Sequence, residues 1–211
     1  MHKLLIPTLL LTTNLLAQTF NVATTPQLRT ALENSAINGE ADTIILADGT
    51  YKTTDDSLGT FTFFDNESYS LTLKGSSKDK VILSGDHVSQ IFNFETTTNK
   101  AGLIVENITF SDANNTNSPG GAIFTDYTLT VVSCDFINNS ATGYGGGFYA
   151  SGSATITNTS FKNNSATGDG GGFYTDNSAT ITDTTFTGNN ASSEGDGHSG
   201  EGVGLELLLQ S

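Results

Sequence analysis

The chain of 211 residues is poor in the residues that cross-link or stiffen small exported domains. It contains one cysteine, Cys134, three prolines and no tryptophan. A single cysteine cannot form an intramolecular disulfide, so a disulfide scaffold and a cysteine-based metal site are both excluded. The length fits one domain, whose stability must come from stacked elements and backbone hydrogen bonds.

Basic residues are scarce as well. The chain has 8 lysines and arginines against 22 aspartates and glutamates, and Arg29 is its single arginine. The acidic residues are spread along the chain rather than gathered in a tail. This balance argues against nucleic acid and anionic lipid headgroups as partners, and it favours solubility outside the cell.

No apolar run is long enough to cross a membrane. Leu4 to Leu16 is rich in leucine but contains Pro7 and a Thr-Thr-Asn segment, and Ala17 offers a small residue for cleavage. These features favour an export signal over a membrane span or a buried N-terminal helix. We therefore assign residues 1–17 to a signal peptide and expect the protein to be exported.

Glycine is abundant, and it takes part in a regular repeat. The segment Gly-Gly-Ala-Ile-Phe at 120–124 returns as Gly-Gly-Gly-Phe-Tyr at 145–149 and, after the same interval, at 170–174. A Phe-x-x-Asn or closely similar segment follows each copy. A fixed period of this length indicates an array in which each unit buries its apolar face against the next. The repeat-motif residues are Gly120, Gly121, Ala122, Ile123, Phe136, Asn139, Gly145, Gly146, Phe148, Phe161, Asn164, Gly170, Gly171, Phe173, Phe186 and Asn189.

Residues within each unit alternate between apolar and polar types. Val131, Ile156 and Ile181 occupy one column of the repeat, and threonines flank it. This alternation predicts short strands with one buried face, and the Gly and Asn clusters predict the corners between them. Short strands, sharp corners and one unit per coil indicate an all-β parallel β-helix that rises about 4.8 Å per coil.

Equivalent residues of successive coils should then stack on one another. We expect the phenylalanines of the Phe-x-x-Asn segments to form an interior aromatic stack. We expect their asparagines to form a corner ladder, in which side-chain amides hydrogen-bond along the axis. The glycine pairs should lie at a tight bend where a side chain would clash.

The first half of the chain predicts a less regular version of the same coil. Turn signals separate strand-like runs at 44–46, 71–73, 81–83, 91–94 and 103–105, and residues 107–110 lead into 111–114, a loose forerunner of the Phe-x-x-Asn segment. One helix should precede them, because Thr24 or Thr25 can cap it, Pro26 lies in its first turn and Gly39 follows its end. This helix would make residues 18–40 a cap over the N-terminal end of the solenoid, with Arg29 on its surface, and the β-helix would occupy 41–194.

The Gly-Gly-Ala-Ile and Phe-x-x-Asn segments together resemble the paired repeat motifs of chlamydial-type polymorphic outer membrane proteins. Residues 120–123 match Gly-Gly-Ala-Ile strictly, and the later copies are relaxed. The stretch Ala-Asp-Thr-Ile-Ile-Leu-Ala-Asp-Gly-Thr-Tyr at 41–51 resembles the first segment of exported β-helix proteins of the pectate-lyase-like superfold. The resemblance implies a single-stranded right-handed parallel β-helix. It also implies a secreted or outer-membrane surface passenger, often involved in adhesion.

The repeat pattern ends after Glu194. Residues 195–211 read as an irregular tail with neither a Phe-x-x-Asn segment nor a helix long enough to cap the last coil. Because members of the resembled family usually carry more coils and a C-terminal barrel, the tail fits a truncated end or a native tail folded over the last coil. An open last coil predicts self-association through its strand edges.

The resembled superfold includes polysaccharide lyases and glycoside hydrolases, but a fold alone does not imply an activity. A lyase needs a basic residue beside carboxylates that hold calcium, and inside the regular coils only Lys162 is basic. A hydrolase needs two carboxylates at a set distance. Asp169 shares a column with Glu194, and Asp126 shares one with Asp176, as chance would give in a stacked acidic protein. We therefore assign no catalytic and no metal-binding residue.

Two functions follow from these observations. The first is a non-enzymatic surface module for adhesion or structure, whose partner would be a host-cell, matrix or glycan surface. The second is a carbohydrate-active enzyme or a carbohydrate-binding module. His87 and His198 are isolated in the sequence and receive no role, and we expect no cofactor. A depolymerisation assay on polysaccharides would separate the two functions.

Overall fold

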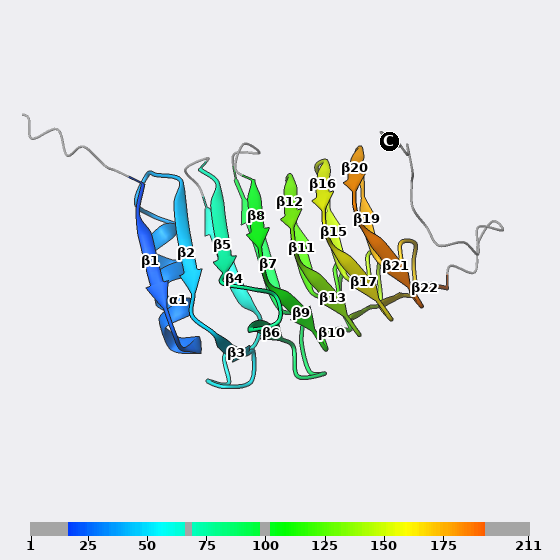
Figure 1. The fold of residues 1–211 in the computed structure, drawn as a ribbon, viewed down its shortest axis with the longest axis horizontal. Helices are drawn as coiled ribbons and strands as arrows, with labels where there is room; N and C mark the ends of the chain where they lie inside the picture. Colours follow the sequence, from blue (N-terminus) through cyan, green and yellow to red (C-terminus); the bar gives the residue numbers. More distant parts are fainter. Residues whose placement is uncertain (1–16, 66–68, 98–101, 193–211) are drawn as a thin grey trace, which may run out of the picture.

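The computed structural model describes residues 17–65, 69–97 and 102–192. In these residues the chain winds into a solenoid whose coils follow one another along a single axis (Figure 1). Four parallel sheets, A to D, run along this axis, the strands of one coil belong to different sheets, and only the later coils contribute to sheet D.

Sheet A contains, in spatial order, β1 (Thr19–Val22), β2 (Asp42–Leu46), β5 (Leu71–Gly75), β8 (Leu103–Glu106), β12 (Leu129–Val132), β16 (Ala154–Thr157) and β20 (Ala179–Thr182). Sheet B contains β3 (Gly49–Lys52), β6 (Val81–Ser84), β9 (Thr109–Ser111), β13 (Asp135–Ile137), β17 (Ser160–Lys162) and β21 (Thr185–Thr187). Sheet C contains β4 (Phe61–Asp65), β7 (Phe92–Thr96), β11 (Ile123–Thr125), β15 (Phe148–Ala150) and β19 (Phe173–Thr175). Sheet D contains the short strands β10 (Asn114–Asn115), β14 (Ser140–Ala141), β18 (Ser165–Ala166) and β22 (Asn190–Ala191).

The strand register follows the period of the sequence repeat. Val131 pairs with Ile156, and Ile156 pairs with Ile181, so each residue meets its own equivalent in the next coil. All three lie on the inner face of sheet A, where Val131 and Ile156 are fully buried. The predicted all-β parallel β-helix with an N-terminal capping helix is therefore confirmed.

The earlier coils are longer and less regular. Asp42 pairs with Leu71 and Leu71 pairs with Leu103, at intervals that are longer than the repeat period and differ from each other. The strand-like runs predicted in this half all lie on strands, although β7 begins at Phe92 and not at residue 91. The structure adds β1, β3, β4, β9 and β10, which the sequence analysis did not predict as strands, because short strands between loops of unequal length have no column of fixed period to reveal them.

Phenylalanines stack through the interior of the regular coils. The Phe136 ring lies 4.9 Å from Phe161 with the planes 6° from parallel, and Phe161 lies 5.0 Å from Phe186 at 7°. Phe110, from the coil before, extends the stack at 5.1 Å. Burial of each phenylalanine contributes about 1.5–3 kcal/mol and each ring contact about 0.5–1.5 kcal/mol, so this column is a main source of stability.

Asparagines line the corner between sheets B and D. Asn139 and Asn164 are fully buried. The Asn139 Nδ2 atom donates to Asn164 Oδ1 at 3.0 Å, and Asn164 Nδ2 donates to Asn189 Oδ1 at 2.9 Å. The three side chains thus form a ladder along the axis, with one rung per coil.

The glycine pairs lie at the corner that leads into sheet C. Gly145 has a φ of +70°, in the left-handed region that side chains rarely adopt. Gly146 has no such dihedral, but an added Cβ would clash with the carbonyl oxygen of Gly171 in the next coil. The first glycine therefore makes the turn, and the second allows the two coils to approach closely.

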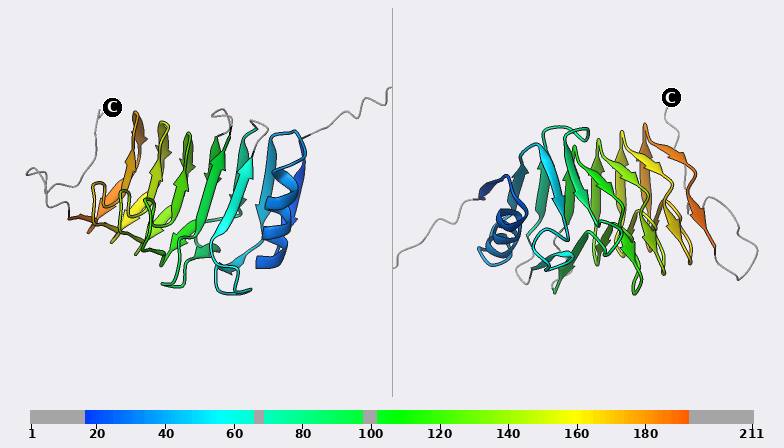
Figure 2. Two further views of the ribbon diagram at one scale, coloured as in Figure 1. Left: turned by 180° about the vertical axis from the view of Figure 1, so that it is seen from behind. Right: turned by 90° about the horizontal axis from the view of Figure 1, so that it is seen from below.

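A single helix of the described residues, α1 (Thr25–Ser35), covers the N-terminal end of the solenoid (Figure 2). Thr24 is its N-cap, and the Thr24 side chain accepts a hydrogen bond from the backbone N–H of Gln27. Leu28 and Leu32 are buried against the first coil. The predicted capping helix is confirmed, and strand β1 joins it in closing this end of the core.

The prediction that Arg29 is a surface residue is wrong. Its side chain is only 13% exposed and forms an ion pair with Asp56 at 2.5 Å. The guanidinium also donates to the carbonyl oxygen of Thr60 at 3.1 Å and lies 4.6 Å from the ring centre of Phe61. Arg29 therefore fixes α1 to the loop between β3 and β4.

Some sequence predictions fall outside the described residues. These are the signal peptide except for Ala17, the irregular tail at 195–211 with His198, and Glu194, the proposed column partner of Asp169.

Candidate interaction surface

The carboxylates that the sequence analysis weighed as catalytic pairs have separate local partners. The Asp126 Oδ2 atom accepts a hydrogen bond from the backbone N–H of Thr96 at 2.7 Å. The Asp176 Oδ2 atom accepts one from the Tyr149 hydroxyl at 2.6 Å. Each carboxylate therefore stabilises the local structure of its coil through a hydrogen bond.

The structure brings together a different carboxylate pair. Asp126 follows β11 and its backbone N–H donates to Phe94 in β7, which places it beside Glu95. Burial raises the pKa of Asp126, the hydrogen bond from Thr96 opposes this, and the negative charge of Glu95 raises the pKa further. The sequence analysis missed this pair, because the two residues belong to coils of unequal length.

Other candidate groups lie apart from this pair. Lys162 is exposed at the end of β17 in sheet B, on a different face of the solenoid. His87 lies 3.8 Å from Asp112, and its side chain is 74% exposed. In residues 17–65, 69–97 and 102–192, no three histidine, cysteine or acidic side chains gather as a metal site would require.

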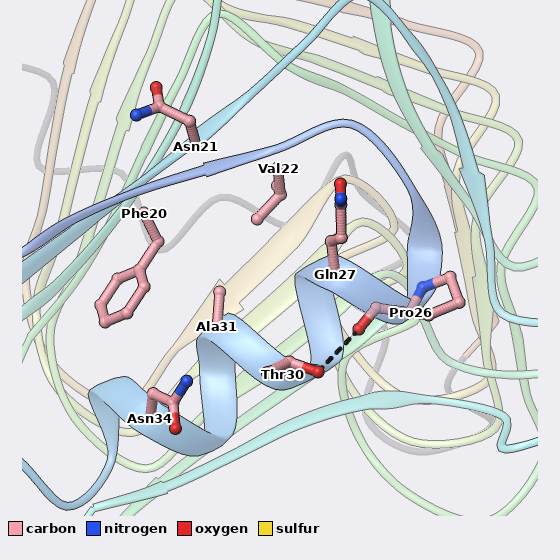
Figure 3. A pocket seen from close by; sticks show the side chains of 8 residues that line it. All are labelled: Phe20, Asn21, Val22, Pro26, Gln27, Thr30, Ala31 and Asn34. Atoms are coloured by element: carbon pink, nitrogen blue, oxygen red, sulfur yellow. Dashed lines mark hydrogen bonds between the residues drawn. The ribbon is translucent and has the colours of Figure 1, made fainter.

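A cavity of about 310 Å³ lies between β1 and α1 at the N-terminal end (Figure 3). Phe20 and Val22 of β1 face Ala31 of α1 across it, and Pro26 and Thr30 complete the wall. All of its lining side chains are uncharged. This cavity therefore offers no carboxyl, imidazole or amine that could act as a general acid or base.

Outward-facing aromatic side chains form a line on sheet C. Phe124 of β11 pairs in register with Tyr149 of β15, which pairs with Tyr174 of β19. The Phe124 and Tyr149 ring centres lie 5.5 Å apart with planes 9° from parallel, and those of Tyr149 and Tyr174 lie 5.9 Å apart at 3°. Tyr144, from the turn before β15, adds a fourth ring 4.9 Å from Tyr174. We call Phe124, Tyr144, Tyr149 and Tyr174 the aromatic ridge.

The local sequence explains why these rings face outward. In a strand, successive side chains point to opposite faces, so burial of Phe148 and Ala150 in the core turns Tyr149 toward solvent. Tyr144 reaches Tyr174 because residue 168 is glycine: an added Cβ at Gly168 would lie 2.9 Å from the Tyr144 ring.

Carboxylates border the aromatic ridge: Asp126 and Asp176 follow Phe124 and Tyr174 by two residues, and Asp169 interacts electrostatically with Tyr174. We call Asp126, Asp169 and Asp176 the acidic border. Burial raises the pKa of Tyr149, and its hydrogen bond to Asp176 raises it further. Burial also raises the pKa of Tyr174, followed by the charges of Asp176 and Asp169. The hydroxyls of Tyr149 and Tyr174 therefore stay protonated at neutral pH and can donate hydrogen bonds.

The stacking limits what the aromatic ridge can bind. Rings that stack along the axis cover each other's faces and present their edges and hydroxyls to solvent, so among the described rings of this row an open face remains only at its ends. A sugar that packs on an aromatic ring needs an open ring face, whereas protein interfaces use aromatic edges and tyrosine hydroxyls freely. The repeat columns do contain a signal for this surface, since Phe124, Tyr149 and Tyr174 share one column. Tyr144 has no equivalent in the other coils.

Comparison with known protein families identifies the repeat. Residues 133–151 and 158–176 match the Chlamydia polymorphic membrane protein repeat. Each matched stretch contains one Phe-x-x-Asn segment and the glycine pair that follows it. The resemblance inferred from the sequence is confirmed: the chain carries this repeat on a parallel β-helix.

Other comparisons add little to this result. No curated protein matches the chain. A solved structure of a mutant PL6-family alginate lyase matches 72% of this chain at 22% identity, with a TM-score of 0.38. The chain spans 20% of the length of that lyase, so this match gives no argument about activity. In the described part of the chain, no helix is both long and apolar enough to span a membrane.

Proposed function

We propose that this chain is a non-enzymatic adhesion module of a cell surface, the passenger-like part of a polymorphic membrane protein. The observation that carries the proposal is the match of two coils to the polymorphic membrane protein repeat. The family name supports a location at the outer-membrane surface. The export signal expected from the sequence would allow the chain to reach that surface.

The aromatic ridge supports a role in binding. Aromatic side chains are enriched at protein interfaces because they bury a large area at a small cost in conformational entropy. Here the rings are already fixed by stacking and by the strand register, so little order is lost on binding. Tyr144 is 43% exposed and is the most accessible of the four.

The adhesion proposal can be tested with the purified full chain on cultured cells and on immobilised matrix proteins. We expect saturable binding that falls when the aromatic ridge is changed by Tyr149→Thr and Tyr174→Thr together. A control with Thr155→Ala and Thr180→Ala, which alters two exposed residues paired on sheet A, should bind as the unmodified chain does. Absence of binding to all surfaces would contradict the proposal.

A carbohydrate-active function is the second candidate, and the Glu95–Asp126 pair favours it. A carboxyl group with a raised pKa beside a second carboxylate is the arrangement that glycoside hydrolysis uses. Incubation with acidic and neutral polysaccharides, with and without calcium, tests this function. Product that disappears in Asp126→Asn would establish it, whereas adhesion without product in any reaction would favour the first proposal.

A further inference from the structure

The aromatic ridge and the acidic border together point to the chemistry of a partner. We propose that this surface, on which the adhesion proposed above would depend, binds an extended arginine-rich segment of another protein. The segment would lie along the solenoid axis, across the outer face of sheet C.

Charge gives the first argument. The regular coils at 120–192 hold one lysine, and it lies on sheet B. Of their aspartates, Asp135 is paired with Lys78 at 2.8 Å, but none of the acidic border takes part in an ion pair within the described part of the chain. The border therefore has an uncompensated negative potential that attracts a cationic partner.

The basic residues of the first half cannot supply this compensation, because each one in the described residues already has an acidic partner. The pairs are Arg29–Asp56, Lys52–Asp86, Lys74–Glu106, Lys78–Asp135 and Lys80–Asp48.

The end of the aromatic ridge gives the second argument. Tyr144 and Tyr149 both come from the coil before Tyr174, and both rings contact Tyr174. Within residues 17–65, 69–97 and 102–192, no ring from a later coil contacts Tyr174, which leaves its C-terminal face without a stacked ring. A guanidinium group stacks on such a face and can also bind a carboxylate through two parallel hydrogen bonds. Asp176 follows Tyr174 by two residues and accepts the hydroxyl of Tyr149 from the same row at 2.6 Å, and the charges of Asp176 and Asp169 raise the pKa of Tyr174, so rings and carboxylates lie together here.

Arginine fits this surface better than lysine does. A lysine ammonium is a strongly hydrated point charge, whereas a guanidinium is planar and more weakly hydrated. An extended partner places its same-side residues about 6.7 Å apart over coils about 4.8 Å apart, and the long arginine side chain can span the difference of about 2 Å. Two arginines at alternate positions can therefore contact the ridge and the border together over neighbouring coils.

The experiment measures binding of a short oligo-arginine peptide to the full chain by calorimetry. Oligolysine of equal length and a neutral Gly-Ser peptide serve as comparison probes. We expect oligo-arginine to bind about tenfold more tightly than oligolysine, since only arginine can stack and bind bidentately. The affinity should fall as salt screens the acidic border. The Gly-Ser peptide should not bind.

Two variants test the site itself. Tyr174→Thr introduces the residue that β4 already carries in this row, Thr62, and should weaken oligo-arginine binding by about tenfold. Asp183→Asn is the matched control, because it removes one exposed negative charge at the corner between sheets A and B. It should change the affinity less than twofold, and circular dichroism should show both variants folded.

Equal binding of the two basic peptides, or equal losses in Tyr174→Thr and Asp183→Asn, would overturn the inference in favour of nonspecific charge attraction. The outcome is separable from that of the adhesion assay. Cell adhesion without peptide binding would overturn this inference and leave the adhesion proposal standing. Peptide binding without adhesion would support the inference about the surface and contradict the adhesion proposal.

Discussion

Asn139 and Asn164, one coil apart, are joined by two hydrogen bonds to a single oxygen atom. The Asn164 Oδ1 atom accepts from Asn139 Nδ2 at 3.0 Å and from the Asn139 backbone N–H at 3.1 Å. Asn164 Nδ2 also donates to the carbonyl oxygen of Phe136 at 2.9 Å. At a buried corner, where strand pairing is interrupted, one side-chain amide thus satisfies a backbone N–H and a backbone carbonyl of the preceding coil.

Asn164→Ala should therefore be strongly destabilising. The change leaves the Asn139 backbone N–H and the Phe136 carbonyl without these partners in a buried site, and it leaves Asn139 Nδ2 with the Phe110 carbonyl as its acceptor. Each unsatisfied group costs about 1–3 kcal/mol, so we expect the free energy of unfolding to fall by about 3 kcal/mol or more. Urea denaturation followed by circular dichroism measures this. Asn190→Ser is the control, because Ser165 occupies the same position one coil earlier, and it should change stability by less than about 0.5 kcal/mol.

The two neighbouring glycine positions should respond in opposite ways to alanine. At Gly146 an added Cβ would clash with the carbonyl oxygen of Gly171, which is backbone and cannot move aside. At Gly172 the nearest atom is 3.3 Å away in the Phe186 ring, and Ala122 already fills this column two coils earlier. We expect Gly146→Ala to lower the melting temperature strongly or to prevent folding. Gly172→Ala should be neutral or raise stability by about 0.5 kcal/mol, because it restricts the unfolded chain. Equal effects would contradict this account.

The regular coils could be predicted from the sequence because a fixed period converts position in the chain into position in space. Once Phe136 and Phe161 are one period apart in a parallel β-helix, their rings must stack, and the structure places them 4.9 Å apart. The same logic applies to the asparagine ladder. Predicting these stacked columns does not require knowledge of the loop structures, since the strands of each coil pair in register with those of the next.

The contacts outside the repeat columns could not be predicted, because they depend on coils of unequal length and on the position of single residues. Glu95 and Asp126 become neighbours through a coil longer than the repeat, so no column of the sequence aligns them. Arg29 reads as a polar residue on an amphipathic helix. Its burial depends on the loop before β4, whose Asp56 side chain reaches back to it. The ring contact between Tyr144 and Tyr174 likewise joins positions that do not share a column.

The Cys134 thiol should be unreactive while the protein is folded. It is fully buried, and burial raises its pKa to about 12. The thiolate, which is the reactive form, is then both scarce and inaccessible at pH 8. We expect a thiol reagent to label the chain only after denaturation. Rapid labelling of the native protein would show that the core opens locally.

The same shift in the Cys134 pKa predicts a loss of stability at high pH. In the unfolded chain this thiol titrates near its ordinary value of 9.0, whereas the folded thiol stays protonated up to about 12. The unfolded state therefore binds fewer protons between these values, and stability falls as pH rises through this window. Below pH 9 the thiol has no effect. Cys134→Ala should show a shallower decline of unfolding free energy above pH 9 than the unmodified chain.

The contacts of Arg29 predict how firmly the cap is held. Its guanidinium binds both carboxylate oxygens of Asp56, with side chains that are 13% and 15% exposed, and donates to the Thr60 carbonyl. Removing one partner of such a shielded pair leaves the other charge without compensation, so Arg29→Met should lower the free energy of unfolding by about 3 kcal/mol. Arg29→Lys should recover only part of this loss, because an ammonium cannot form the two parallel bonds. Lys80→Met, at an exposed ion pair, is the control and should unfold as the unmodified chain does.

The pH dependence of Arg29→Met separates this ion pair from simple packing. The hydrogen bond from Arg29 holds the pKa of Asp56 below its ordinary value of 3.8. A carboxyl group with a lowered folded pKa stabilises the protein fully above the unfolded value, and this contribution is lost as pH falls through the folded value. The difference in unfolding free energy between the unmodified chain and Arg29→Met should therefore be largest near pH 7 and shrink below pH 4. A difference that stays constant down to pH 2 would mean that Arg29 acts through its contact with Phe61 and not through Asp56.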